Sequence, residues 1–310
     1  MKCAVNNQKA WAWQESELRT IPCPICSSDD YKIVYPRADN LEIVSCNNCL
    51  FRFIQPQPSQ QELNRFYQQG YFSGGHDFHQ GDNYFDSRNK AITTEQVTGW
   101  QFLKSNIELD QKKLLDLGCA DGALLVLAQQ YGATEVIGVE VSEEAATCGR
   151  DRYGLEILTS SADRLCFADG TFNVVTAFDL IEHVCQPAQL FEEVHRVLSV
   201  GGVFVGGCPD VSCFDDWKAE WIGVRKNMEH LSYFSDRALE HLAEKVGFKV
   251  TLLQYQGFPL ELKHYINLHN SRITKALQPN VWIYNVWQKL RFKAKQSQHR
   301  HELMFILQKF

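Results

Sequence analysis

The sequence lacks the long apolar runs and the surplus of positive charge that are typical of membrane-spanning or nucleic-acid-binding chains. It has no uncharged apolar run of about 18 residues, the length that a helix needs to cross a bilayer. Its first 20 residues do not place an apolar stretch behind basic residues, as a secretory signal does. The net charge of -6 and the pI near 5.9 argue against generic binding to nucleic-acid phosphates. We therefore expect a cytoplasmic protein that binds no nucleic acid.

Composition and length indicate an ordinary folded protein with two unequal units. The 310 residues are 45% hydrophobic and 22% charged, which is enough apolar material for a sizeable core. One domain of about 200 residues with a smaller appendage fits this length.

Eleven cysteines are a high and odd number, and four of them form two close pairs. Cys23 and Cys26 are followed after nineteen residues by Cys46 and Cys49, a spacing typical of a tetrahedral zinc site. Between the pairs, alternating apolar and polar residues predict a two-stranded ribbon over 31–35 and 41–45. All four candidate ligands are thiolates, so the zinc would be structural. Redox pairs or disulfides are the alternative, which a cytosolic setting disfavours. We interpret the other seven cysteines as small apolar residues.

Residues 112–208 alternate short apolar runs with helical patterns, which predicts parallel strands joined by crossover helices. The predicted strands are 113–117, 135–139, 156–159, 173–178 and 203–206. The predicted helices are 123–131, 143–153 and 188–198. This order indicates a doubly wound α/β sheet.

The first of these strands ends in a loop of small residues that could bring the backbone close to a ligand. Gly118, Ala120 and Gly122 allow a tight turn before a helix N-terminus. A nicotinamide-binding protein would share this pattern. Asp116 instead suits a cationic or amino-bearing ligand, and Glu140 closes the second strand where it could accept both hydroxyls of a ribose.

On these residues the sequence resembles the class I S-adenosylmethionine-dependent methyltransferases. The segments 165–175, 178–184 and 196–202 are similar to that family's fourth strand and the turn before its fifth. The resemblance implies a Rossmann-like seven-stranded sheet with an antiparallel last strand, its final hairpin formed by 248–255 and 301–310. It also implies a set of cofactor-binding residues. These are Asp116, Gly118, Ala120, Gly122, Glu140, Ser161, Ala162 and Phe178. Ala120 and Ser161 depart from the usual Gly and Asp of the family, and the second change puts an adenine contact in doubt.

The acceptor side is indicated by Glu229-His230-Leu-Ser-Tyr233-Phe234, which precedes a predicted helix over 236–246 with Ser235 as its N-cap. This segment resembles the Glu-His-Leu-x-x-Phe motif of zinc-containing methyltransferases, deoxysugar C-methyltransferases among them. That resemblance implies His230 as general base and Glu229 as the group that orients it. Packing beneath the helix cap is the alternative for His230. His183, after the fourth strand, either lines the methionine end of the cofactor or closes a helix N-terminus.

Two aromatic segments complete the acceptor side. Tyr67, Tyr71 and Tyr84 resemble positions near the acceptor in relatives, and glycines among them suit a lid, although packing between units would look the same. Residues 262–301 hold eight Lys or Arg and no Asp or Glu, with interleaved aromatics. That segment could bind a phosphate-bearing acceptor, lie on an anionic membrane or form a solvated helix.

These observations predict S-adenosylmethionine-dependent methyl transfer to a small-molecule acceptor such as a sugar or sugar nucleotide, with structural Zn2+. The resemblance also extends to ubiquinone-biosynthesis-type O-methyltransferases. An rRNA methyltransferase with a zinc ribbon and a catalytically silent scaffold remain alternatives. The predicted units are an N-terminal tail (1–20), a zinc-binding module (21–55), an aromatic connector and lid (56–110), a methyltransferase core (111–256), a basic aromatic insertion (257–300) and a final core strand (301–310). The sequence does not fix the oligomeric state.

Overall fold

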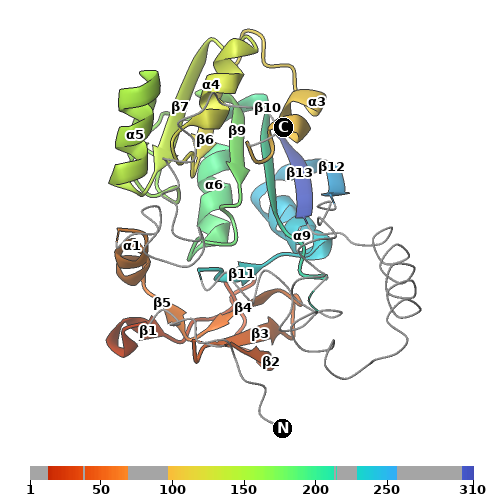
Figure 1. Cartoon of the computed structure of the whole chain (residues 1–310). Helices are drawn as coiled ribbons and strands as arrows, with labels where there is room; N and C mark the ends of the chain where they lie inside the picture. Colours follow the sequence, from red (N-terminus) through yellow and green to blue (C-terminus); the bar gives the residue numbers. More distant parts are fainter. Residues whose placement is uncertain (1–12, 38, 69–96, 213, 215–228, 257–301) are drawn as a thin grey trace, which may run out of the picture.

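The computed structural model describes residues 13–37, 39–68, 97–212, 214, 229–256 and 302–310. Figure 1 shows a large sheet with helices on both faces, and beneath it a smaller sheet formed mostly by the N-terminal part of the chain. The segments 1–12, 69–96 and 257–301, which include most of the expected tail, lid and basic insertion, lie outside the described residues. Among the described helices, none is long and apolar enough to cross a membrane.

The large sheet has seven strands in the order β12-β13-β10-β9-β6-β7-β8. Its strands are β6 (Lys113–Leu117), β7 (Glu135–Glu140), β8 (Glu156–Thr159), β9 (Phe172–Phe178), β10 (Leu198–Pro209), β12 (Phe248–Gln256) and β13 (Glu302–Lys309). The last strand, β13, runs antiparallel to both of its neighbours, whereas β6 to β10 pair in parallel. The predicted Rossmann-like sheet with an antiparallel last strand is confirmed.

Alternating side chains of the strands supply two cores, one on each face of the sheet. Leu115 and Leu117 pack with α6 (Pro187–Val197) and α9 (Asp236–Val246), whereas Leu114 faces the other way. That second face is covered by α3 (Trp100–Asn106), α4 (Ala123–Gln130) and α5 (Glu143–Tyr153). Ser142 and Ser235 cap α5 and α9 by accepting a backbone N–H in the first turn, as predicted for Ser235.

The smaller sheet combines three strands from the first part of the chain with one short strand from residues 232–233. Its order is β11-β4-β3-β2, from β2 (Tyr31–Pro36), β3 (Glu42–Cys46), β4 (Arg52–Gln55) and β11 (Ser232–Tyr233). Strands β2 and β3 confirm the predicted ribbon. Strand β11, however, follows β10 by more than twenty residues and lies antiparallel to β4. Nearby stand a short helix η1 (Glu15–Glu17), the pair β1 (Leu18–Arg19) and β5 (Gln57–Pro58), and α1 (Gln60–Gln68).

The fifth parallel strand is longer than its apolar run predicts. Residues 203–206 were expected, but β10 extends from Leu198 to Pro209. Its far end is held by β13, which pairs with it in register from Val203 to Pro209. Since this pairing partner comes from the last ten residues of the chain, local hydrophobicity could not set the end of the strand.

Candidate functional site

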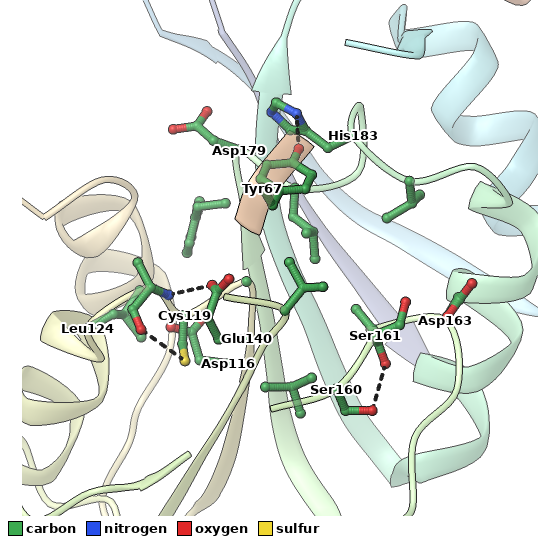
Figure 2. Close-up of a pocket in the computed structure, with 18 of the residues that line it drawn as sticks. Tyr67, Asp116, Cys119, Leu124, Glu140, Ser160, Ser161, Asp163, Asp179 and His183 are labelled. Atoms are coloured by element: carbon green, nitrogen blue, oxygen red, sulfur yellow. Dashed lines mark hydrogen bonds between the residues drawn. The ribbon is translucent and has the colours of Figure 1, made fainter. Parts of the chain in front are cut away.

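A cavity of about 270 Å3 opens at the carboxyl ends of β6, β7, β8 and β9, where open α/β sheets hold ligands. In Figure 2, Asp116 and Glu140 lie toward one end of this cavity, and Tyr67 and His183 lie at the other. Ser161 and Ala162 line it beyond β8, and Phe178 lines it at the end of β9. The structure thus brings together residues from three strands, from the segment that follows β8 and from α1.

The loop between β6 and α4 has the conformation that small residues permit. Gly118, Ala120 and Gly122 all have positive φ, of 68°, 49° and 77°. Gly118 and Ala120 line the cavity. Gly122 is absent from the described lining; it precedes α4, and a Cβ on it would lie 2.4 Å from Leu155. Its role is therefore to let the loop pack against the sheet.

Asp116 is a buried acid at the end of β6, and only 5% of it is exposed. Thr176 on β9 donates a hydrogen bond of 2.7 Å to its Oδ1. Burial raises the pKa of Asp116 to about 7, and the nearby carboxylate of Glu140 adds to this shift while the Thr176 bond opposes it. A carboxyl that half-ionises near neutral pH inside a cavity is poised to accept a cationic group.

Glu140, at the end of β7, accepts backbone hydrogen bonds from two loops with its two carboxylate oxygens. Oε2 accepts the backbone N–H of Ala120 at 2.9 Å, and Oε1 accepts that of Ser142, also at 2.9 Å. Burial raises the pKa of Glu140, and these backbone hydrogen bonds work against the shift. The residue therefore holds the glycine-rich loop in place as well as facing the cavity.

The opposite end of the cavity is built around His183. The hydroxyl of Tyr67 on α1 lies 3.0 Å from its Nδ1, so two residues 116 positions apart meet there. Its Nε2 lies 3.8 Å from the Glu182 carboxylate. Burial lowers the pKa of His183 to about 4, although a hydrogen bond with the backbone of Glu229 favours the charged form. The imidazole is therefore neutral at physiological pH.

His230 and Glu229 stand one layer behind His183. The two imidazole rings meet edge to face, with centroids 4.7 Å apart. Both His230 and Glu229 are almost fully buried, and neither belongs to the described cavity lining. The Nε2 of His230 lies 4.0 Å from the Glu182 carboxylate, which thus stands near both histidines. Tyr71 and Tyr84 lie outside the described residues.

Two acidic residues near this end of the cavity, Asp179 and Glu182, were not among the site residues predicted from the sequence. Asp179 lines the cavity with a positive φ of 51°, and burial raises its pKa to about 6. Glu182 is 2% exposed, and burial together with the charge of Asp179 raises its pKa well above the ordinary value. The signal was present in the sequence, because Asp179, Glu182 and His183 lie within five residues after an apolar strand.

Among the residues that the structure describes, two groups of side chains have the geometry to hold a metal ion. The four thiols of Cys23, Cys26, Cys46 and Cys49 lie within 4.8 Å of one another. In each pair the residue after the second cysteine has positive φ, Ser27 at 60° and Leu50 at 63°, so both Cys-x-x-Cys segments end in the same type of turn. Four converging thiols with no disulfide between them fit a tetrahedral Zn2+ shell. The ligand atoms of Glu182, His183 and His230 also lie within 4.8 Å of one another.

Comparisons with known proteins agree with this architecture. A family model described as a methyltransferase domain matches residues 96–253, which is just over half of the chain. A probable S-adenosylmethionine-dependent methyltransferase of Mycolicibacterium smegmatis is 28% identical over 177 residues, 55% of this chain and 67% of that protein. A ubiquinone biosynthesis O-methyltransferase of Methylococcus capsulatus is 29% identical over 123 residues, 38% of this chain and 52% of that protein.

A solved structure shares the fold. The S-adenosylmethionine-dependent methyltransferase from Mesorhizobium loti matches with a TM-score of 0.50 and 17% identity, over 70% of this chain and 100% of that one. The chain spans only about one third to two thirds of the length of the curated relatives that it matches. Since the matching family model covers the seven-stranded sheet up to β12 together with its ligand-facing edge, the chain belongs to the methyltransferase domain family and contains a class I S-adenosylmethionine-dependent methyltransferase domain.

Proposed function

We propose that this protein transfers the methyl group of S-adenosylmethionine to a small-molecule acceptor bound at the Tyr67–His183 end of the cavity. The observation that carries the proposal is that the two ends of one continuous cavity are lined by different kinds of side chain. Acids suited to a cationic nucleoside, Asp116 and Glu140, line it toward one end, and a neutral histidine paired with a tyrosine lines it at the other.

The residues at the first end fit the cofactor. S-adenosylmethionine supplies an electrophilic methyl group on a positively charged sulfur when it is bound. Asp116 would hold its amino-bearing end, because a buried carboxylate with a raised pKa gains most from a nearby cation. Glu140 would accept the ribose hydroxyls with the lone pairs that the Ala120 and Ser142 amides leave open. Ser161, Ala162 and Phe178 would border the adenine and the methyl-bearing sulfur.

The other end would align and deprotonate the acceptor. Methyl transfer requires an in-line approach of the nucleophilic atom, and holding two reactants in that geometry supplies much of the acceleration. Where the nucleophile is a hydroxyl or an activated C–H, its proton passes to the Tyr67–His183 pair as the new bond to the methyl group forms. His230, Glu229 and Glu182 would support His183 from behind and stabilise the imidazolium that results.

A sugar or sugar nucleotide is the acceptor class that we favour. The segment from Glu229 to Phe234 resembles the motif of deoxysugar C-methyltransferases, and hydrogen-bonding groups line the acceptor end of the cavity. A relative named for ubiquinone biosynthesis is consistent with a small molecule in this place. The four cysteines, in this proposal, hold a structural zinc ion.

Two measurements test the proposal. Isothermal titration with S-adenosylmethionine is expected to give saturable binding, which Asp116→Ala abolishes without unfolding the protein. Incubation with methyl-labelled cofactor and a metabolite extract, followed by mass spectrometry, is expected to reveal a labelled small molecule. Absence of cofactor heat at millimolar concentration would favour the scaffold alternative. Label found only in added ribosomal RNA would favour the RNA alternative.

A further inference from the structure

Arg37 reaches from the four-cysteine module to the back of the histidine pair. It follows β2, and its side chain is 2% exposed. Its Nε and Nη2 donate to the two carboxylate oxygens of Asp39 at 3.1 and 2.7 Å. Its Nη1 donates to the backbone carbonyl of His230 at 2.6 Å and to the hydroxyl of Tyr233 at 3.0 Å. One buried guanidinium therefore touches the segment that carries His230 at two points.

Asp39, whose carboxylate binds Arg37, is itself held by a further hydrogen bond. Asp39 also accepts a hydrogen bond of 2.7 Å from the indole Nε1 of Trp13. The ring centroids of Trp13 and Phe66 lie 5.8 Å apart, and those of Phe66 and Tyr67 lie 5.3 Å apart. Since Tyr67 bonds His183 and His183 contacts His230, these contacts form a closed circuit around the acceptor end of the cavity.

The backbone on the far side of His230 is held just as firmly. Ile54 of β4 donates its N–H to the Leu231 carbonyl at 3.0 Å, and β11 pairs with β4 from Ser232 onward. The N–H groups of Leu231 and Ser232 both point to the Glu182 carbonyl, at 2.8 and 3.1 Å. The segment is thus fixed between the cysteine module and the loop that carries His183.

We propose that Arg37 is a positioning residue, which sets the orientation of His230 behind His183 and thereby makes the cysteine module part of the acceptor site. This inference rests on the proposed function for its consequence in catalysis, but its geometric content does not. A planar guanidinium suits the task because it can bond a carboxylate with one edge and two further acceptors with the remaining N–H groups. Lysine, with a single ammonium, cannot satisfy all these partners together.

The test reads His230 directly and needs neither acceptor nor cofactor. Histidine side-chain resonances are recorded by NMR on the full, metal-loaded chain, with His230→Gln to assign the His230 signals. Arg37→Met is expected to shift the imidazole signals of His230, and Arg37→Lys is expected to restore them in part. Tyr233→Phe removes only the hydroxyl that Arg37 bonds, so it should shift the same signals by less.

Lys245→Met is the matched control. Lys245 on α9 donates to the Ile25 carbonyl at 2.6 Å, so it also ties the module to the core, but among the described residues this hydrogen bond does not involve the His230 segment. We expect this variant to leave the His230 signals unchanged. Metal content and cofactor affinity, measured for every variant, should stay within about twofold of the parent protein.

The outcomes distinguish the positioning role of Arg37 from the proposed function in methyl transfer. Unmoved His230 signals in Arg37→Met, or an equal shift in Lys245→Met, would overturn the positioning role whatever the protein methylates. If Arg37→Met does not fold, Arg37→Lys and Tyr233→Phe decide the question by the same criterion. Once an acceptor is known, the misplaced His230 should lower turnover by about 10²-fold in Arg37→Met. A shifted His230 with unchanged turnover would instead contradict the catalytic part of the proposed function.

Discussion

The backbone N–H of Ala120 donates a hydrogen bond of 2.9 Å to the carboxylate of Glu140, across the tips of β6 and β7. The second oxygen of the same carboxylate accepts the N–H of Ser142. Glu140 therefore stabilises the conformation of this loop in the ligand-free protein. In the proposed function, Glu140 would contact the ribose directly, in addition to holding this loop in place.

Glu140→Gln is expected to lower the stability of the folded protein even without ligand. A glutamine side chain has one acceptor oxygen, so its amide N–H2 would face a backbone donor in a buried place. Such a mismatch costs about 1–3 kcal/mol in the free energy of unfolding. Thermal unfolding of the ligand-free protein measures it. Glu144→Gln, in the exposed first turn of α5, is the control and should change little. Equal melting temperatures for all three proteins would contradict the structural part of the role.

Cofactor affinity is expected to rise with pH up to about 7 and then level off. Burial raises the pKa of Asp116 to about 7, so below that pH the carboxyl is protonated and cannot pair with a cation. Binding should release a proton in this range, which titration calorimetry detects in buffers of different ionisation enthalpy. Asp116→Asn should bind weakly and with a flatter pH profile. Asp169→Asn, whose side chain is 80% exposed, should behave like the parent.

His183→Gln is expected to lower turnover by about 10²–10⁴-fold with cofactor affinity retained, as removal of a general base does. His230→Gln should also lower turnover, because it removes the ring that packs against His183. Initial rates with the acceptor identified by labelling check this prediction. A larger loss in His230→Gln than in His183→Gln would return the base role to His230. Unaltered rates in both variants would exclude a proton acceptor at this end of the cavity.

The four-cysteine group is expected to hold one zinc ion whose loss frees β11 from the module. Cys46→Ser should reduce the zinc content measured by elemental mass spectrometry and lower the melting temperature. Because β4 pairs with β11, hydrogen exchange should accelerate at Ser232 and Tyr233. Cys166→Ser changes an exposed cysteine outside the group and is the control. Protected amides at 232 and 233 in a zinc-free protein would show that the metal does not stabilise this pairing.

The ligand-free protein is expected to lose stability as pH rises from about 4 to about 8. Burial, together with the charge of Asp179, raises the pKa of Glu302 to about 8. Over this range the unfolded chain gives up the proton that the folded chain retains, so the free energy of unfolding falls. His183, whose pKa is lowered to about 4, acts in the opposite direction between about 4 and 6.5.

Glu302→Gln isolates the carboxyl part of this effect. The variant should match the parent near pH 4 and exceed its melting temperature near pH 8, because the amide has no proton to lose. Thermal unfolding at several pH values provides the measurement. Glu240→Gln, on the exposed side of α9, should reproduce the parent curve. A variant that melts below the parent at pH 8 would mean that Glu302 makes an ionic contact, and the sign of the prediction would be wrong.

Local patterns were sufficient for most of the large sheet. Apolar runs bounded by turn residues fixed β6, β8 and β9 nearly to the residue, and Ser235 marked the start of α9. The two cysteine pairs likewise predicted a ribbon, because both the alternation and the metal spacing are properties of short segments. The far end of β10 was beyond such reasoning, since it depends on pairing with β13 at the other end of the chain.

The order of strands and helices, the glycine-rich turn and the two acids at strand ends could all be predicted, since each follows from residues close together along the chain. Which distant groups meet depends instead on the tertiary structure. It seated Tyr67 against His183, placed β11 in the module's sheet, and joined Arg37 to His230 across 193 positions. Such contacts depend on how separate elements pack, and no local periodicity encodes the register between them.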